Sequence, residues 1–262
     1  MRFRLSHDAR PQAMTLLAAA IISVLLWFIP YVEILGYPFR LFVTFIHEGS
    51  HALAAVLTGH SVHSLSVSLD TSGLTKREPA GLLANIFISS AGYLGSMAFG
   101  AFLLFLIRKS VKSRFILAAC GVLIAALTIV FGVFTSAFSL EAWSGIPFTL
   151  LSGSLISIGL LLMANFATKR VATFLVSFLA VQCVLNALLD LKTVFFLSTP
   201  FAPTIPNDAV NMASYTGVPA ILWAALWIAL ALGILWFTMR LYVAGRDKSY
   251  QPDLPFEETP PI

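Results

Sequence analysis

Three ionisable residues, His47, Glu48 and His51, stand within five positions of an otherwise apolar stretch. If that stretch is helical, the two histidines lie one turn apart on the same face, so both imidazoles can reach one metal ion. Glu48 lies beside His47 and can project next to the ion without binding it, where it can take a proton from metal-bound water. The pattern predicts a hydrolytic zinc site with Glu48 as its general base.

A third protein ligand must come from elsewhere in the chain, because a catalytic zinc ion generally takes three and leaves the fourth position to water. Asp190 is the carboxylate that lies well inside a late apolar block. Glu141 and Asp208 fall in expected loops, and Asp70 falls in an expected strand region. We therefore expect Asp190 to complete a site for one zinc ion per chain. The alternative for Asp190 is an ion pair with Lys192 or a polar contact between helices.

The composition places these residues in a membrane protein. Of the 262 residues, 58% are hydrophobic and 11% are charged, against roughly 25% charged in an average soluble domain. The apolar residues run in blocks of about 20 or more, which is the length that crosses a hydrocarbon core of about 30 Å as a helix. We expect an integral multi-pass membrane protein, in which ionisable side chains at membrane depth mark function.

The apolar blocks predict an all-α bundle of about seven spans, with six to eight allowed. The candidate spans are residues 14–35, 38–58, 81–107, 113–135, 146–165, 170–198 and 218–243. Residues 14–243 would form one membrane-embedded domain between an N-terminal tail, 1–13, and a C-terminal tail, 244–262. Four prolines among polar residues predict that the C-terminal tail is disordered.

The segment after the second expected span has a different pattern. Residues 61–70 alternate between apolar and polar side chains, which is typical of a strand, and 71–73 would form the turn that follows. A strand inserted between spans could pair with an extended substrate by edge addition.

Basic residues indicate the orientation in the membrane, because cytoplasmic loops are enriched in Lys and Arg. They gather between the third and fourth spans, before the sixth and after the last, whereas residues 136–145 and 199–217 contain none. This predicts a cytoplasmic C-terminus, in the cell membrane. The basic residues lie in loops and chain ends rather than on a folded basic surface, so we expect no nucleic-acid partner. Seven spans would put the N-terminus outside despite Arg2, Arg4 and Arg10, which is why the number of spans stays open.

Several segments together resemble the site-2-protease-like family of intramembrane zinc metalloproteases, in its compact bacterial-type branch. They are the run His47-Glu48-Gly49-Ser50-His51-Ala52, the turn containing Gly59, the strand-like segment, the run at 90–95 and the late pair Leu189-Asp190. The resemblance covers roughly residues 38–243. It implies zinc ligation by His47, His51 and Asp190, with Glu48 as the base, and hydrolysis of peptide bonds in or near the spans of membrane-protein substrates.

Two positions depart from the family pattern. Relatives often follow the Leu-Asp pair with Gly and place Asn eight residues before the Asp, whereas this chain has Leu191 and Gln182. Gln182 could still hydrogen-bond a substrate backbone, and Asn186 could do the same or orient the Asp190 carboxylate. The alternative function is a non-proteolytic membrane scaffold or binding protein with a vestigial or structural metal site. A transporter is a third possibility, and the sequence indicates neither the substrate nor the oligomeric state.

Overall fold

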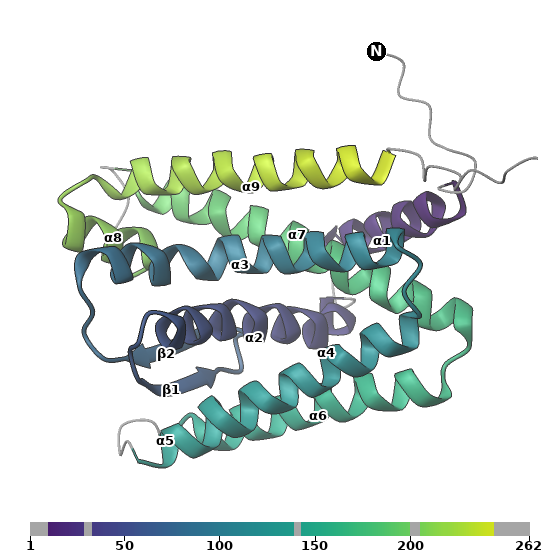
Figure 1. Cartoon of the computed structure of the whole chain (residues 1–262), viewed down its shortest axis with the longest axis horizontal. Helices are drawn as coiled ribbons and strands as arrows, with labels where there is room; N and C mark the ends of the chain where they lie inside the picture. The colour runs from purple at the N-terminus through teal and green to yellow at the C-terminus, as the bar shows by residue number, and fades with distance from the viewer. Residues whose placement is uncertain (1–9, 29–32, 139–142, 200–204, 244–262) are drawn as a thin grey trace, which may run out of the picture.

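The computed structural model describes residues 10–28, 33–138, 143–199 and 205–243, and most of them are helical (Figure 1). The predicted C-terminal tail lies outside these ranges, as do residues 1–9 of the predicted N-terminal tail. The elements are, in order, α1 (Arg10–Phe28), α2 (Glu33–Leu57), β1 (Val62–Val67), β2 (Gly73–Arg77), α3 (Leu82–Arg108), α4 (Ser113–Leu127), the π-helix η1 (Thr128–Phe134), α5 (Thr135–Ala137), α6 (Ile146–Phe166), α7 (Lys169–Leu197), α8 (Asp208–Thr216) and α9 (Ala220–Val243). The predicted helical bundle with a small strand insertion is confirmed.

Five helical segments are long and apolar enough to cross a membrane. They are Leu82–Arg108, Ser113–Ala137, Ile146–Phe166, Lys169–Leu197 and Ala220–Leu241. The predicted number of about seven is not confirmed, because the apolar part of α1, Met14–Leu25, is shorter. The second predicted span corresponds to α2, whose apolar residues are interrupted by the polar residues of the expected metal site.

The helices that carry the expected site pack closely on one another. α3 lies between α2 and α7, and small residues along it let the helix backbones approach. A Cβ atom added at Gly100 would come within 2.9 Å of the carbonyl oxygen of Ala180 on α7. On α2, Phe42 and Phe45 are fully buried in the core that also receives Leu65 of β1. The side of α2 that bears the two histidines lies against α3, because Gly92 of α3 is close to both imidazoles.

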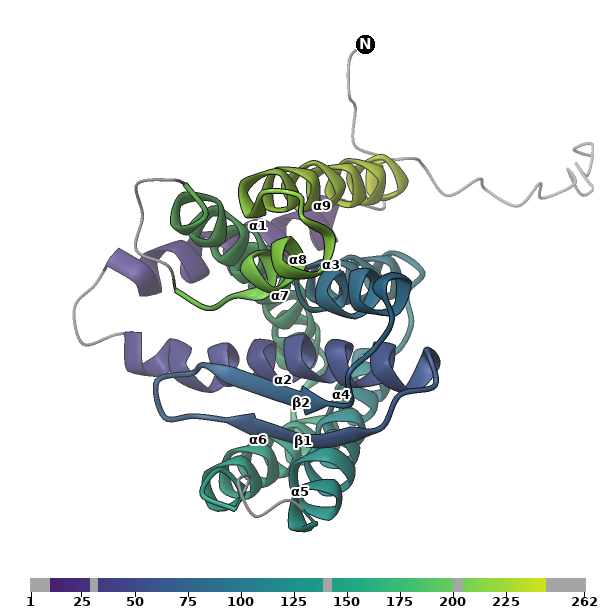
Figure 2. The same ribbon diagram turned by 90° about the vertical axis from the view of Figure 1, so that its left-hand side faces the viewer.

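The polar insertion folds into a two-stranded antiparallel hairpin that lies along α2 (Figure 2). Leu65 of β1 pairs with Thr75 of β2. The predicted strand is confirmed from Val62 to Val67 but ends earlier than predicted, because Asp70 accepts hydrogen bonds from the backbone N–H (3.0 Å) and hydroxyl (2.7 Å) of Ser72 and so closes the turn. These two bonds hold the pKa of Asp70 below its usual value.

The two strands have different surroundings. The backbone N–H of Val67 in β1 donates to the hydroxyl of Thr149 on α6, at 2.9 Å, so α6 covers part of the outer edge of β1. β2 instead lines a cavity together with α2. The hairpin and α8 lie at one end of the bundle, on the left in Figure 1, and the α3–α4 and α6–α7 connections lie at the other.

Candidate metal centre

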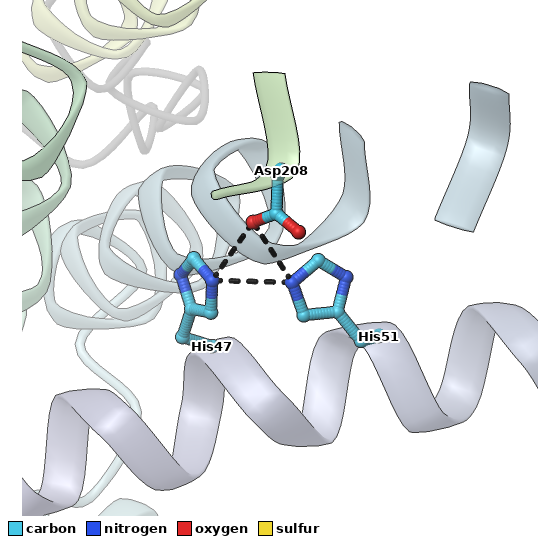
Figure 3. Close-up of side chains that lie close together, drawn as sticks. All are labelled: His47, His51 and Asp208. Carbon is cyan, nitrogen blue, oxygen red and sulfur yellow. Dashed lines mark hydrogen bonds and ion pairs between the residues drawn. The ribbon is translucent and has the colours of Figure 1, made fainter. Parts of the chain in front are cut away.

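The two histidines of α2 point to one spot (Figure 3). The Nε2 atoms of His47 and His51 are 3.1 Å apart, as helical spacing of four residues allows. The Nδ1 atom of His51 lies 2.7 Å from the carbonyl oxygen of Ile88 on α3. A carbonyl can only accept a hydrogen bond, so Nδ1 carries the proton and leaves the lone pair of Nε2 available to a metal.

Asp208 brings a carboxylate to the same spot. Its Oδ2 atom lies 3.5 Å from Nε2 of His47 and 3.3 Å from Nε2 of His51 (Figure 3). Asp208 is the first residue of α8, and the side chain of the preceding Asn207 caps that helix by accepting hydrogen bonds from two backbone N–H groups. The N-terminus of α8, which packs on α3 and α9, thus sets the position of the carboxylate.

These three side chains fit a zinc ion by chemistry and by spacing. Two donor atoms that each lie about 2.0–2.1 Å from a tetrahedral zinc ion are about 3.3 Å apart. The observed separations of 3.1, 3.3 and 3.5 Å match this value within a few tenths of an ångström. Burial raises the pKa of Asp208, but in the metal-free site the positive charge of protonated His51 and hydrogen bonds from both protonated histidines outweigh it and hold that pKa well below its usual value. The carboxylate is therefore ionised, as a metal ligand must be.

Asp190, the predicted third ligand, lies on α7 and lines the same cavity as the histidines. Among the described residues, the possible metal ligands whose ligand atoms all lie within 4.8 Å of one another are His47, His51 and Asp208. Asp190 does not belong to this group. No ion pair joins Asp190 to Lys192 in the described part of the chain. Ligation by Asp190 stays a prediction, and the structure adds Asp208 as a second candidate in direct contact with the imidazoles.

A local signal for Asp208 exists in the sequence. Asn207 precedes a short run that ends at Thr216-Gly217, and Gly217 adopts the left-handed conformation that often ends a helix. Such caps predict a short helix within the segment that is expected to be a loop. They do not predict that this helix packs on α3 beside the histidines.

Glu48 is buried beneath β2. Its Oε2 atom accepts a hydrogen bond of 2.7 Å from the hydroxyl of Thr75, which also lies 3.1 Å from the Glu48 carbonyl oxygen. Gly73 lies against the same carboxylate, and a Cβ atom there would overlap the Glu48 side chain. The hairpin thus fixes the carboxylate that the sequence predicts to be the general base.

The other wall of the site comes from α3. Gly92 passes so close to the Nε2 atoms of His47 and His51 that a Cβ atom at this position would overlap both. The ring of Tyr93 meets His47 edge to face, with centroids 4.7 Å apart, and its other neighbour is Trp227 of α9, at 5.5 Å. The indole N–H of Trp227 donates to the hydroxyl of Ser90, at 2.9 Å. These contacts join α9 to the metal site.

Gln182 and Asn186 form a polar pair on α7. The amide of Asn186 donates to the backbone and side-chain oxygens of Gln182, at 2.8 and 2.9 Å, and Asn186 lines the cavity. Gln182 is buried, is not among the residues that line this cavity, and donates to Ser23 of α1 at 3.4 Å. No hydrogen bond joins Asn186 to Asp190 among the described residues. Substrate contact by either residue stays a prediction, and the geometry gives only Asn186 direct access.

The site opens into a large cavity. Its volume is about 1490 Å³, whereas a pocket for a small molecule typically measures about 300–1,000 Å³. The lining comes from α2, the turn and β2 of the hairpin, the start of α3, the C-terminal part of α7 and α8. A cavity of this size can take several residues of an extended peptide.

A family model described as peptidase M50B-like matches residues 16–238, which include every residue of the site. No curated protein and no solved structure matches the chain.

Proposed function

Because the chain belongs to the peptidase M50B-like family, the site-2-protease group of membrane metallopeptidases, we propose that it is an intramembrane zinc protease that hydrolyses peptide bonds in or near the spans of membrane proteins. The observation that carries the proposal is the convergence of His47, His51 and Asp208 beside the buried carboxylate of Glu48. Two imidazoles and one carboxylate with a separate general base are typical of hydrolytic zinc sites.

In this proposal, His47 and His51 hold the zinc ion through Nε2, and Asp208 is the third ligand. Asp190, on the facing helix, is the competing candidate for that third position. When bound there, zinc acts as a Lewis acid toward water and toward the oxygen of a peptide carbonyl. The hydrogen bond between His51 Nδ1 and the Ile88 carbonyl fixes the tautomer and the ring orientation that this binding needs.

Glu48 acts as the general base. Its carboxylate takes a proton from the attacking water and passes it to the amine that leaves when the C–N bond breaks. The hydroxyl of Thr75 donates to Oε2 and holds the carboxylate in one orientation. Oε1 makes no hydrogen bond among the described residues and can face the water.

The hairpin offers a place for the substrate. A helix hides its carbonyl groups in backbone hydrogen bonds, so a spanning segment must unwind before it is cut. β2 borders the cavity and contacts Glu48, whereas α6 occupies part of the outer edge of β1. We therefore transfer to β2 the expected pairing with an extended substrate, which the sequence had suggested for residues 61–70.

The orientation in the membrane follows from the basic residues. Those at the end of α3, at the start of α7 and near the end of α9 gather at the end of the bundle opposite the hairpin (Figure 1). The excess of Lys and Arg in cytoplasmic loops supports a cytoplasmic C-terminus in a cell membrane. The cavity, lined by the hairpin and α8, then opens toward the other side.

The proposal is tested by cleavage of peptides of spanning length. Purified protein loaded with zinc in detergent would be incubated with a mixture of synthetic apolar peptides of about 20 residues, and the products would be identified by mass spectrometry. We expect products from the wild type and none from Glu48→Gln at equal zinc content. A zinc-loaded wild type that cuts none of the peptides would favour the non-proteolytic scaffold.

A further inference from the structure

Arg77 ends β2 and is held in place by neutral oxygen atoms. One of its terminal nitrogens, Nη1, donates to the carbonyl oxygen of Glu78 at 3.0 Å, and the other, Nη2, donates to Oδ1 of Asn85 at 2.7 Å. Asn85 is buried at the start of α3, and its amide donates in turn to the carbonyl oxygen of Ala80 at 2.7 Å. This chain of bonds fixes the direction of the guanidinium group.

The positive charge of Arg77 has no carboxylate partner among the described residues. The carboxylate of the adjacent Glu78 instead accepts a hydrogen bond of 3.2 Å from the backbone N–H of Ser61. A guanidinium group has five N–H donors, and the bonds to Glu78 and Asn85 use two of them. The remaining donors are available to a ligand.

Arg77 lines the same cavity as His47 and Glu48. It stands two positions after Thr75, whose hydroxyl contacts Glu48. Side chains two apart on a strand point to the same face and are about 7 Å apart along it. Arg77 is therefore on the Glu48 side of β2, about two residues away from the general base.

We propose that Arg77 forms a carboxylate-binding subsite of this cavity and selects peptides that carry an acidic group. A planar, fixed guanidinium with free donors suits two parallel hydrogen bonds to a carboxylate, and its partners Asn85 and Glu78 supply only neutral oxygens. The carboxylate comes from an Asp or Glu side chain or from the C-terminus of a peptide.

The position of the acidic group along the substrate rests on the proposed protease function. With a peptide extended beside β2, the side chain that meets Arg77 is about two residues from the one that lies beside Thr75 and Glu48. Cleaved peptides are expected to carry the acidic residue two or three positions from the cut bond.

The test measures binding, so that it is independent of cleavage. Zinc-loaded Glu48→Gln protein would be immobilised in detergent and exposed to a mixture of apolar peptides in which each position varies among Asp, Glu, Asn and Gln. Bound and input peptides would be compared by mass spectrometry. The same selection would be run with Arg77→Gln, with Arg77→Lys and with Lys169→Gln, each in the Glu48→Gln background. Lys169→Gln is the matched control, because it removes one positive charge at the far end of α7.

We expect Asp and Glu to be enriched over Asn and Gln at one position. Arg77→Gln should reduce this enrichment at least about tenfold, as loss of hydrogen bonds between charged groups does, while Arg77→Lys keeps part of it and Lys169→Gln keeps all of it. Peptides with amidated C-termini separate the two sources of the carboxylate. A bound pool without acidic enrichment, or equal enrichment with Arg77→Gln at unchanged zinc content, would overturn the proposal. Absence of cleavage by the wild type would instead count against the protease function alone.

Discussion

The hydroxyl of Thr75, on the second strand of the hairpin, donates a hydrogen bond of 2.7 Å to the carboxylate of Glu48 on the helix that carries the histidines. Through this bond, the same strand that borders the cavity also orients the proposed base. A peptide that pairs with β2 would therefore lie beside the carboxylate that is proposed to activate the water.

Replacement of Thr75 tests this link. Thr75→Val keeps the shape of the side chain and removes the donor, so we expect kcat/KM to fall about tenfold or more, as for a lost hydrogen bond to a charged group. Zinc content should stay at the wild-type level, because Thr75 contacts no metal ligand directly in the described structure. Thr75→Ser is the matched control and should keep most of the activity in the peptide-cleavage assay. Equal activity of the Val and Ser variants would contradict the role of this hydrogen bond.

Metal content distinguishes the two candidates for the third ligand. We expect Asp208→Ala to lower zinc affinity by more than about 100-fold. Loss of a residue that only hydrogen-bonds to a metal ligand already lowers the affinity by about 10–100-fold. Asp190→Ala should retain about one zinc ion per chain, as should Glu48→Gln. Elemental analysis of protein purified in detergent, with His47→Ala as the reference for a lost ligand, measures this directly. Loss of zinc with Asp190→Ala but not with Asp208→Ala would assign the third position to Asp190.

The close passage of α3 over the metal site leads to a prediction for Gly92. A Cβ atom at this position would overlap the Nε2 atoms of both histidines, so Gly92→Ala should displace the imidazoles and abolish zinc binding. Alanine stabilises a helix relative to glycine by about 1 kcal/mol, so the substitution should not lower the helix propensity of α3. Gly159→Ala on α6 is the control, since an added Cβ there meets no atom within 4 Å. Zinc titration of both variants tests the prediction, and normal binding by Gly92→Ala would refute it.

The parts of the site that sequence reasoning predicted are those fixed by local periodicity. The spacing of His47 and His51 places both on one face of any helix, and the alternation after Gly59 indicates a strand without knowledge of its partner. The family model confirms the resemblance that these patterns suggested. Both features depend on residues within a few positions of one another.

The remaining parts depend on contacts between distant segments. Asp208 is 157 positions after His51 (208 minus 51), and its place is set by the packing of α8 on α3 and α9. Depth within an apolar block favoured Asp190, but a short capped helix between two long helices can carry a carboxylate to the same cavity. The second strand was also missed, because Gly73–Arg77 contains two basic residues and only one large apolar side chain. In the structure this segment is a strand because it pairs with β1 and contacts Glu48.

The orientation of the chain leads to the final prediction. If the basic connections are cytoplasmic, then Lys112, between α3 and α4, and Ser214, an exposed residue of α8, lie on opposite sides of the membrane. In intact cells, a membrane-impermeant maleimide should label Ser214→Cys and leave Lys112→Cys unlabelled, and both should react after permeabilisation. The two native cysteines, Cys120 and Cys183, are buried. Buried thiols are inert toward such reagents, so background labelling should be low. The reverse pattern would place the cavity on the cytoplasmic side and would show that the basic loops of this chain do not follow the general charge rule.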